Sequence, residues 1–167
     1  MKRIAAVSLF FFAAAFTASA KQPVQDGDQT AIHAIVESFR TAIIERDKPR
    51  FLSLFVKPDL PWQSVLTDRS LAKVRNESPK ASKARFKTEN NPTEFIDEIV
   101  NSAASSEETF SNVKIDSDGD VATVSFDYAF LAGGKATNSG RECWLLVRTE
   151  SGWKITTLAY SVELAAD

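Results

Sequence analysis

The sequence predicts an α+β fold in which helices gather on one side of an antiparallel sheet. Apolar residues in the first half recur at three- and four-residue spacing, as in amphipathic helices. From Glu107 onward they alternate with polar residues, which is typical of strands. A block of helices followed by a block of strands is characteristic of α+β proteins.

Residues 1–20 have the layout of a secretory signal peptide. Lys2 and Arg3 precede an apolar run over residues 4–16, and Ala18-Ser19-Ala20 is a small-residue cleavage motif. The apolar run is shorter than the roughly 20 residues that span a bilayer. We therefore expect cleavage after this motif, a periplasmic or secreted protein, and no membrane span in the mature chain. The alternative is an anchor that is retained.

The expected mature chain, residues 21–167, is long enough for one domain with its own core. The whole chain has a formal charge of −2, and removing Lys2 and Arg3 gives −2 − 2 = −4. This balance argues against nucleic acid as a partner. Cys143 is the only cysteine, so no intrachain disulfide can form. Its place in an apolar strand pattern predicts a buried, unreactive thiol.

The first predicted helix covers DQTAIHAIVESFRTAIIERD, with Asp28 or Thr30 as its N-cap. Its apolar stripe consists of Ile32, Ile35, Val36, Phe39, Ala42 and Ile43. A second, short helix over KPRFLSLFV follows a tight corner at residues 47–49. The spacing of the stripe indicates a helix that packs against a core.

Residues 61–67 could form a short strand, and residues 68–90 read as a basic loop. Between Arg69 and Lys87 there are seven basic residues and one acidic residue. This segment is either a solvated loop or frayed helix, or an arm that binds an anion or a membrane surface. Its basic residues do not follow one helical face, as an interfacial helix requires.

A third helix is predicted over Pro92–Ser106, with Asn91 as its cap. Its apolar face comprises Phe95, Ile96, Ile99 and Val100. Four strands follow, over residues 108–115, 120–132, 142–148 and 153–164. The breaks between them are DSDGD, GGKATNSG and TESG, which predict an antiparallel meander.

The last hairpin is apolar on both faces in its simplest register. The pairs would be Arg148–Trp153, Leu146–Ile155 and Trp144–Thr157. The opposite face would then carry Cys143, Leu145, Val147, Thr156, Leu158 and Tyr160. One face meets the helices, and the other would leave a large apolar patch unless it is covered. The sequence therefore predicts a homodimer through the sheet.

The segment NSGRECWLLVRTESGWKITTLAYS resembles the closing hairpin of nuclear transport factor 2-like (SnoaL-like) domains. The residues that carry the resemblance are Glu142, Trp144, Leu146, Val147, Gly152, Trp153, Lys154, Ile155 and Ser161. The resemblance implies a cone-shaped, curved antiparallel sheet wrapped by three N-terminal helices, an apolar pocket and frequent homodimers. The family includes isomerases, dehydratases, cyclases, epoxide hydrolases and exported members without assigned function, so the fold alone selects no activity.

Enzymes of this family use Asp, His or Tyr in the pocket; ketosteroid isomerase pairs an Asp base with a Tyr and a protonated Asp. No such set can be placed on this chain. His33 falls on the polar flank of the first helix, and residues 157–159 lack the histidine that many active relatives carry there. Tyr128 is either a hydroxyl donor in the pocket or a core tyrosine, and Asp127 faces the other way.

No cofactor or metal is predicted. The DSDGD motif has its glycine at the wrong position for an EF-hand and reads as a tight hairpin turn. One cysteine and one histidine cannot build a metal cluster, and Gly133-Gly134 lacks the lysine and serine of a phosphate loop.

Three hypotheses follow, and whether the protein is an enzyme stays open. The first is an exported domain that binds a small apolar or aromatic ligand, or a protein partner, without catalysis. Its predicted pocket residues are Phe39, Phe126, Tyr128, Trp144 and Thr157. The alternative is a lyase or isomerase of the polyketide cyclase or ketosteroid isomerase type with Tyr128 as donor. The third is an interaction protein whose basic segment, residues 69–87, binds an acidic surface.

Overall fold

The computed structural model describes residues 26–166, so the expected signal peptide lies outside the described residues. The helices are α1 (Asp26–Glu45), α2 (Lys48–Ser53), α3 (Asp68–Glu77) and α4 (Pro92–Asn101). The strands are β1 (Gln63–Leu66), β2 (Ala84–Arg85), β3 (Ser106–Ser117), β4 (Val121–Ala132), β5 (Lys135–Thr149) and β6 (Gly152–Leu164). None of the helices within this range is long and apolar enough to cross a membrane.

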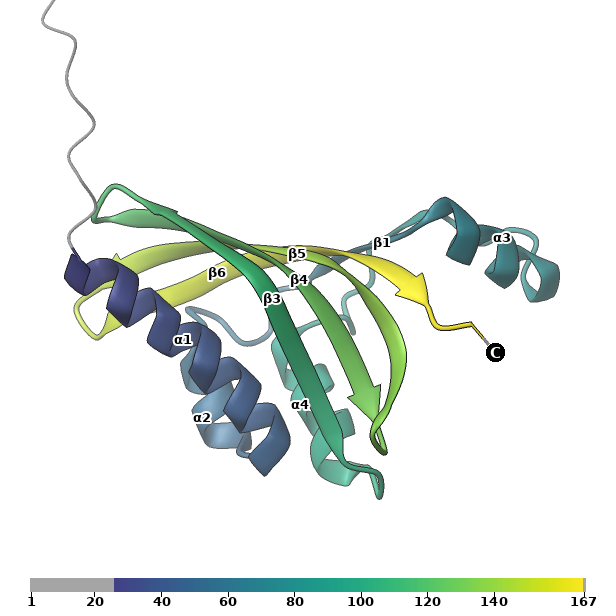
Figure 1. Ribbon diagram of the computed structural model, residues 1–167, viewed down its shortest axis with the longest axis horizontal. Helices are drawn as coiled ribbons and strands as arrows, with labels where there is room; N and C mark the ends of the chain where they lie inside the picture. Colours follow the sequence, from purple (N-terminus) through teal and green to yellow (C-terminus); the bar gives the residue numbers. More distant parts are fainter. Residues whose placement is uncertain (1–25, 167) are drawn as a thin grey trace, which may run out of the picture.

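The six strands form one curved sheet in the order β2-β1-β6-β5-β4-β3. Helices α1, α2 and α4 lie beneath its concave face, and α3 lies beyond one end (Figure 1). The predicted meander from β3 to β6 is confirmed. The predicted strand near residues 61–67 is also confirmed, as β1, which pairs in parallel with β6. The helices and the concave face enclose an aromatic-rich core.

Helix α1 buries the predicted apolar stripe, with Ile32, Phe39 and Ile43 at most 1% exposed. The predicted N-cap is wrong, because α1 begins at Asp26 and both Asp28 and Thr30 lie inside it. The carboxylate of Asp28 instead forms an ion pair with Arg148, which joins the start of α1 to β5. The side chain of Asp28, which the local sequence indicates as a cap, is therefore engaged in a tertiary ion pair instead.

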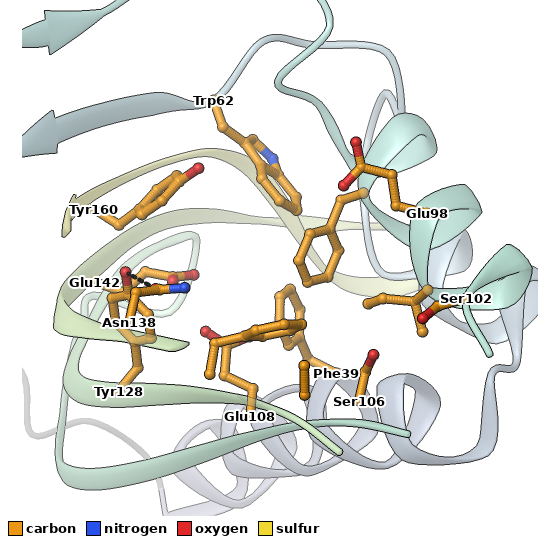
Figure 2. Close-up of a pocket in the computed structure, with 14 residues that line it drawn as sticks. Phe39, Trp62, Glu98, Ser102, Ser106, Glu108, Tyr128, Asn138, Glu142 and Tyr160 are labelled. Carbon is orange, nitrogen blue, oxygen red and sulfur yellow. Dashed lines mark hydrogen bonds between the residues drawn. The ribbon is translucent and has the colours of Figure 1, made fainter. Parts of the chain in front are cut away.

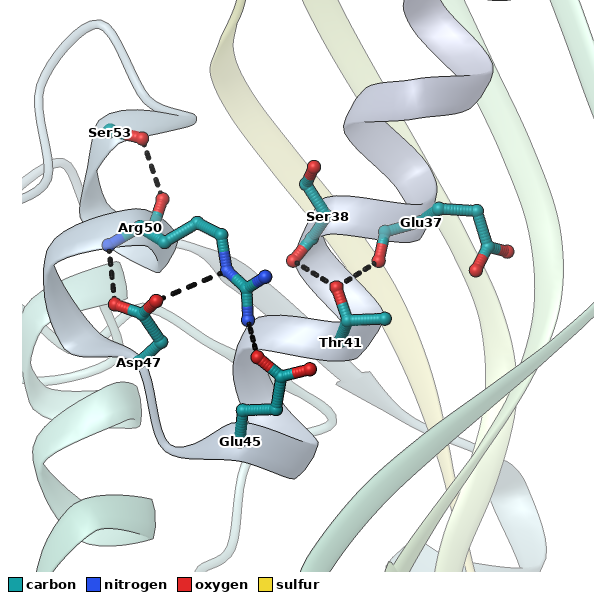
Figure 3. Close-up of polar contacts among 7 residues, drawn as sticks. All are labelled: Glu37, Ser38, Thr41, Glu45, Asp47, Arg50 and Ser53. Carbon is teal, nitrogen blue, oxygen red and sulfur yellow. Dashed lines mark hydrogen bonds and ion pairs between the residues drawn. The ribbon is translucent and has the colours of Figure 1, made fainter.

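The predicted corner between α1 and α2 is confirmed (Figure 3). Asp47 caps α2 by accepting a hydrogen bond from the backbone nitrogen of Arg50 over 3.0 Å. The Arg50 guanidinium contacts both Glu45, at 2.6 Å, and Asp47, at 3.4 Å. These contacts link the end of α1 to the start of α2.

Helix α4 has the predicted cap, since Asn91 Oδ1 accepts from the backbone nitrogen of Glu94 over 3.0 Å. The helix ends at Asn101, five residues before the predicted end at Ser106. The Arg46 guanidinium donates to the carbonyl oxygens of Ser102 and Ala104, each over 2.8 Å. Those hydrogen bonds hold the chain in an extended path that leads directly into β3.

The prediction of a loop over residues 68–90 is wrong in part. Residues 68–77 form α3, which Thr67 caps, and Ala84–Arg85 form β2 against β1. Lys83 pairs with Asp68 at 2.5 Å, and Arg69 pairs with Glu163 of β6. A proper N-cap and these ion pairs stabilise a helix that composition alone does not indicate.

Two predicted features of the strands need correction. The break GGKATNSG shrinks to the turn at Gly133 and Gly134, and β5 begins at Lys135 because its polar start still pairs with β4. In the last hairpin, a register shift between Leu145 and Leu146 pairs Trp144 with Leu158, so the predicted Trp144–Thr157 pair is wrong. The first two predicted pairs, Arg148–Trp153 and Leu146–Ile155, are confirmed.

The register shift reassigns the faces of β6. Leu158 is 2% exposed and lies on the concave face, whereas Thr157 is exposed on the outer face. Cys143 is also exposed on the outer face, so the prediction of a buried thiol is wrong. Side chains alternate between the two faces of a strand, so Cys143, which lies between the inward-facing Glu142 and Trp144, points to the outer face.

Candidate functional site

A cavity of about 350 Å³ lies between the concave face of the sheet and helices α1 and α4. Its aromatic lining consists of Phe39, Trp62, Phe95, Tyr128, Phe130 and Tyr160. Three carboxyl groups line it as well, those of Glu98, Glu108 and Glu142. In Figure 2, Glu142, Asn138 and Tyr128 gather at one end of the cavity, and Glu98 and Ser102 lie at the other.

Strand alternation brings the polar side chains of the cavity together. Glu108 lies opposite Phe130 on the neighbouring strand β4, and Glu142 lies between Phe126 of β4 and Tyr160 of β6. Side chains that pair directly across a sheet point to the same face. Each of the four consecutive strands β3 to β6 therefore places one ionisable group on the concave face. These groups are Glu108, Tyr128, Glu142 and Tyr160, in strand order.

Glu108 and Glu142 are each only 4% exposed. Trp144 Nε1 donates a hydrogen bond of 2.5 Å to Glu142 Oε1. No hydrogen bond or ion pair between described residues involves the Glu108 side chain. Burial raises the pKa of Glu142 to about 7, and burial together with the nearby Glu142 carboxyl raises the pKa of Glu108 well above its usual value. Near neutral pH, both buried acids therefore favour the protonated form more than an exposed glutamate does.

The two tyrosines of the cavity direct their hydroxyl groups at protein acceptors. Tyr128 Oη lies 3.0 Å from Asn138 Oδ1 and 2.9 Å from the carbonyl oxygen of Ser161. Tyr160 donates to Asn90 Oδ1 over 3.0 Å. Burial raises the pKa of both phenols, so both stay neutral. A phenol has one proton, and the protein's own acceptors take it, which leaves Tyr128 no proton to donate to a ligand.

The structure brings only two of the five predicted pocket residues to the cavity, Phe39 and Tyr128. Phe126 and Trp144 lie deeper in the core, packed edge to face with ring centroids 5.0 Å apart. Thr157 is on the outer face, so its predicted place in the pocket is wrong, and the cause is the register shift in β6. His33 is exposed on α1, as expected.

Sequence reasoning missed both buried acids. By sequence, Glu142 is only one of the residues that resemble the closing hairpin of the family, and Glu108 is only the first residue of a predicted strand. A signal was present, because Glu142 shares its face with Trp144 and Leu146 by alternation. An acidic residue at an inward position among large apolar ones indicates a buried carboxyl. Among residues 26–166 there is no group of three metal-ligating side chains suited to hold a metal ion.

The sequence matches no protein-family model and no curated protein. Its structure, however, resembles several solved ones. A proposed dehydratase of the nuclear transport factor 2-like family from Streptomyces avermitilis aligns with a TM-score of 0.60 at 17% identity, over 85% of this chain and 100% of that one. A nuclear transport factor 2-like protein of unknown function from Pseudomonas putida gives 0.60 at 11% identity, over 87% and 93% of the two chains.

The chain has the nuclear transport factor 2-like fold. A proposed scytalone dehydratase from Novosphingobium aromaticivorans, with a TM-score of 0.58 at 14% identity over 84% of this chain and 87% of that one, has the same architecture. The cone-shaped sheet and the helices that the hairpin resemblance implied are thus confirmed. At these identities, the nuclear transport factor 2-like fold carries no activity with it.

Proposed function

We propose that this protein binds a small, largely apolar organic molecule in the cavity of its cone. The observation that carries the proposal is a cavity of about 350 Å³ in which six aromatic side chains surround two buried carboxyl groups. Ligand sites in proteins are typically concave, apolar and equipped with a few polar groups that orient the ligand. We include in the proposal that the protein acts in the periplasm or outside the cell, which the signal-peptide pattern of residues 1–20 supports.

The unpartnered Glu108 supports a binding role over a purely structural one. Burying a carboxyl group without a hydrogen-bond partner destabilises a fold, and a core position would be better filled by an apolar side chain. Glu108 is 96% buried, and its oxygens have no partner among the described residues. A ligand in the cavity would supply the missing partner.

We expect the neutral aromatic dye 6-propionyl-2-dimethylaminonaphthalene to bind the cavity and shift its emission to the blue. Ala132→Trp should weaken its binding at least about tenfold, since Ala132 lines the cavity and an indole there would fill it. Ala136→Trp is the matched control, because Ala136 is exposed on the same hairpin. A fluorescence titration measures both. Equal binding by the two variants, or no blue shift with the wild-type protein, would contradict the proposal.

A second candidate function, proton transfer in a lyase or isomerase, is favoured by one observation. Glu142 has a pKa of about 7, near the value at which a carboxyl group works best as a general acid or base at neutral pH. In this reaction Tyr128 would orient Asn138 rather than donate a proton, because its hydroxyl proton goes to protein acceptors.

The expected result for this second function is deuterium incorporation next to the carbonyl of 2-tetralone in D₂O, followed by NMR. Glu142→Gln should slow it by about 100-fold or more, since it removes the proton acceptor. Glu107→Gln, the same change on β3 at a side chain that points to the opposite face of the sheet, should leave the rate unaltered. Exchange no faster than in buffer, or an undiminished rate in Glu142→Gln, would rule out this role for Glu142.

The homodimer through the sheet stays a prediction. The outer face is hollowed between β4, β5 and β6 and carries Cys143, Leu145 and Thr157. Leu145 and Val65 are 38% and 37% exposed there. We include in the proposal that a second copy of the chain covers this face.

A further inference from the structure

We propose that the ligand of this cavity is an organic cation, an amine or quaternary ammonium with an apolar body, whose charged nitrogen lies against Glu108 and Glu142. This inference rests on the proposed binding function and gives the chemical class of the ligand. It is carried by three features of the described residues: the sign of the charges that line the cavity, the unpartnered carboxyl group of Glu108, and the orientation of the tyrosine hydroxyls.

The ionisable lining of the cavity has one sign. Carboxyl groups enter from α4 (Glu98), β3 (Glu108) and β5 (Glu142). No lysine, arginine or histidine is among the residues that line it. A buried carboxylate normally has a cation or several hydrogen-bond donors beside it. Two buried carboxyl groups without a cation beside them form a site whose natural complement is a positive charge.

Glu108 is the buried carboxyl group that lacks a partner within residues 26–166. Its side chain is 96% buried and makes no hydrogen bond or ion pair with another described residue, and Figure 2 shows it among the side chains that surround the cavity. Glu142 uses one oxygen to accept from Trp144, which leaves its other oxygen available. An ammonium group between the two carboxyls would satisfy both.

The aromatic side chains fit the same ligand. Trp62, Tyr128 and Tyr160 line the cavity together with three phenylalanines. Cations bind favourably over the faces of aromatic rings, and Trp and Tyr give the strongest interactions. The hydroxyl protons of both tyrosines go to protein acceptors, so neither ring offers a donor to an anion. The carboxyl groups of the lining therefore disfavour anionic ligands by charge.

A neutral carbonyl compound is the remaining alternative, because a protonated carboxyl group can donate to it. The dependence of affinity on pH distinguishes the two. The titratable groups that face the cavity are Glu98, Glu108, Tyr128, Glu142 and Tyr160, and burial keeps both phenols neutral. Glu142 has a pKa of about 7, so its charge changes near neutral pH.

A cation binds the ionised form of Glu142, so its affinity should rise by about tenfold between pH 6 and pH 8, as the ionised fraction does. A carbonyl compound that needs the protonated form should lose affinity by a similar factor over the same interval. The two classes of ligand thus give opposite signs.

The experiment compares phenyltrimethylammonium with tert-butylbenzene, its neutral isostere, by displacement of the naphthalene dye at pH 6 and pH 8. We expect the cation to bind at least about tenfold more tightly than the isostere at pH 8, and more tightly at pH 8 than at pH 6. Equal binding of the two, or cation binding that weakens from pH 6 to pH 8, would overturn the inference and leave the proposed binding function intact. Failure of the dye itself to bind would instead refute the proposed function.

Glu108→Gln and Glu142→Gln should each abolish the preference for the cation while tert-butylbenzene and the dye still bind. Retained binding of these neutral molecules shows that the variants are folded. Glu107→Gln is the control, because it makes the same change on β3 at a side chain that points to the opposite face. A cation preference that survives both substitutions inside the cavity would overturn the inference.

Discussion

Replacement of Gly140 with alanine is expected to lower the free energy of unfolding by at least about 3 kcal/mol, more than a typical substitution. A Cβ atom at this position would lie 2.0 Å from the carbonyl oxygen of Ser161 and 2.8 Å from its carbonyl carbon. These are backbone atoms of β6 and cannot rotate away as the end of a side chain could. Strands β5 and β6 would have to separate at this point.

The same substitution should also disrupt the cavity. The carbonyl oxygen of Ser161 accepts from Tyr128, and its hydroxyl accepts from the backbone nitrogen of Arg141 over 2.9 Å. Movement of β6 would also shift Tyr160, which pairs across the sheet with Glu142. We expect Gly140→Ala to lose dye binding together with stability, as measured by fluorescence titration and by urea unfolding.

Gly27→Ala is the control for Gly140→Ala. Gly27 lies in the first turns of α1, and a Cβ atom there would meet nothing within 4 Å. Alanine favours a helix over glycine by up to about 1 kcal/mol, so this variant should be as stable as the wild type or slightly more so. If Gly140→Ala unfolds at the same urea concentration as Gly27→Ala, the close approach of β5 and β6 is refuted.

Features that depend on local sequence could be predicted. The apolar stripe of α1, the Asn91 cap of α4 and the alternation of β3 to β6 are each determined within a few residues. The curvature of the sheet was accessible only through the hairpin resemblance. The parallel pairing of β1 with β6 joins segments about a hundred residues apart, and no local pattern in the sequence marks it.

The errors at the site have one main physical origin. Assigning side chains to the two faces by strict alternation assumes unbroken pairing of the strands. The irregularity between Leu145 and Leu146 breaks that pairing. One extra residue in β6 moves Thr157 to the outer face and Leu158 to the concave face. The buried acids were missed for another reason, since glutamate is almost never fully buried without a partner. Their position becomes informative only once the faces of the strands are known.

The free energy of unfolding is expected to fall as the pH rises from 5.5 to 8.5. Glu142 has a pKa of about 7 in the folded protein, against 4.5 as its ordinary value. The folded state therefore binds more protons than the unfolded state between these values, and stability decreases with pH there. This stability is fully present below pH 4.5 and is lost as the pH rises through 7. From pH 5.5 to 8.5 the loss from Glu142 alone is about 2 kcal/mol.

Other titrating carboxyl groups act outside this window. Ion pairs and hydrogen bonds lower the pKa of Asp68 and Glu163, whose ordinary values are 3.8 and 4.5. Their contribution to stability is present above those values and is lost as the pH falls through the lower folded values. Glu108 acts in the same direction as Glu142, because burial raises its pKa too. Measurements from pH 5.5 upward therefore isolate the buried pair.

Glu142→Gln should make the stability of the protein less dependent on pH. The glutamine oxygen can still accept from Trp144 Nε1, but the side chain cannot ionise. The difference in unfolding free energy between variant and wild type should therefore shift by about 2 kcal/mol in favour of the variant between pH 5.5 and pH 8.5. Urea unfolding at the two values measures this shift, with Glu107→Gln expected to parallel the wild type.

A parallel course for Glu142→Gln and the wild type would mean that Glu142 titrates normally and is not buried as described. If the expected shift is found, Glu142 is an ionisable residue whose replacement by its uncharged isostere, glutamine, would make the protein less sensitive to a rise in pH. A residue that lowers stability where it stands, and that lines a cavity, is better explained by what it binds than by what it packs against. Phenyltrimethylammonium should then restore stability to the wild type at pH 8.5, and should not do so for Glu142→Gln.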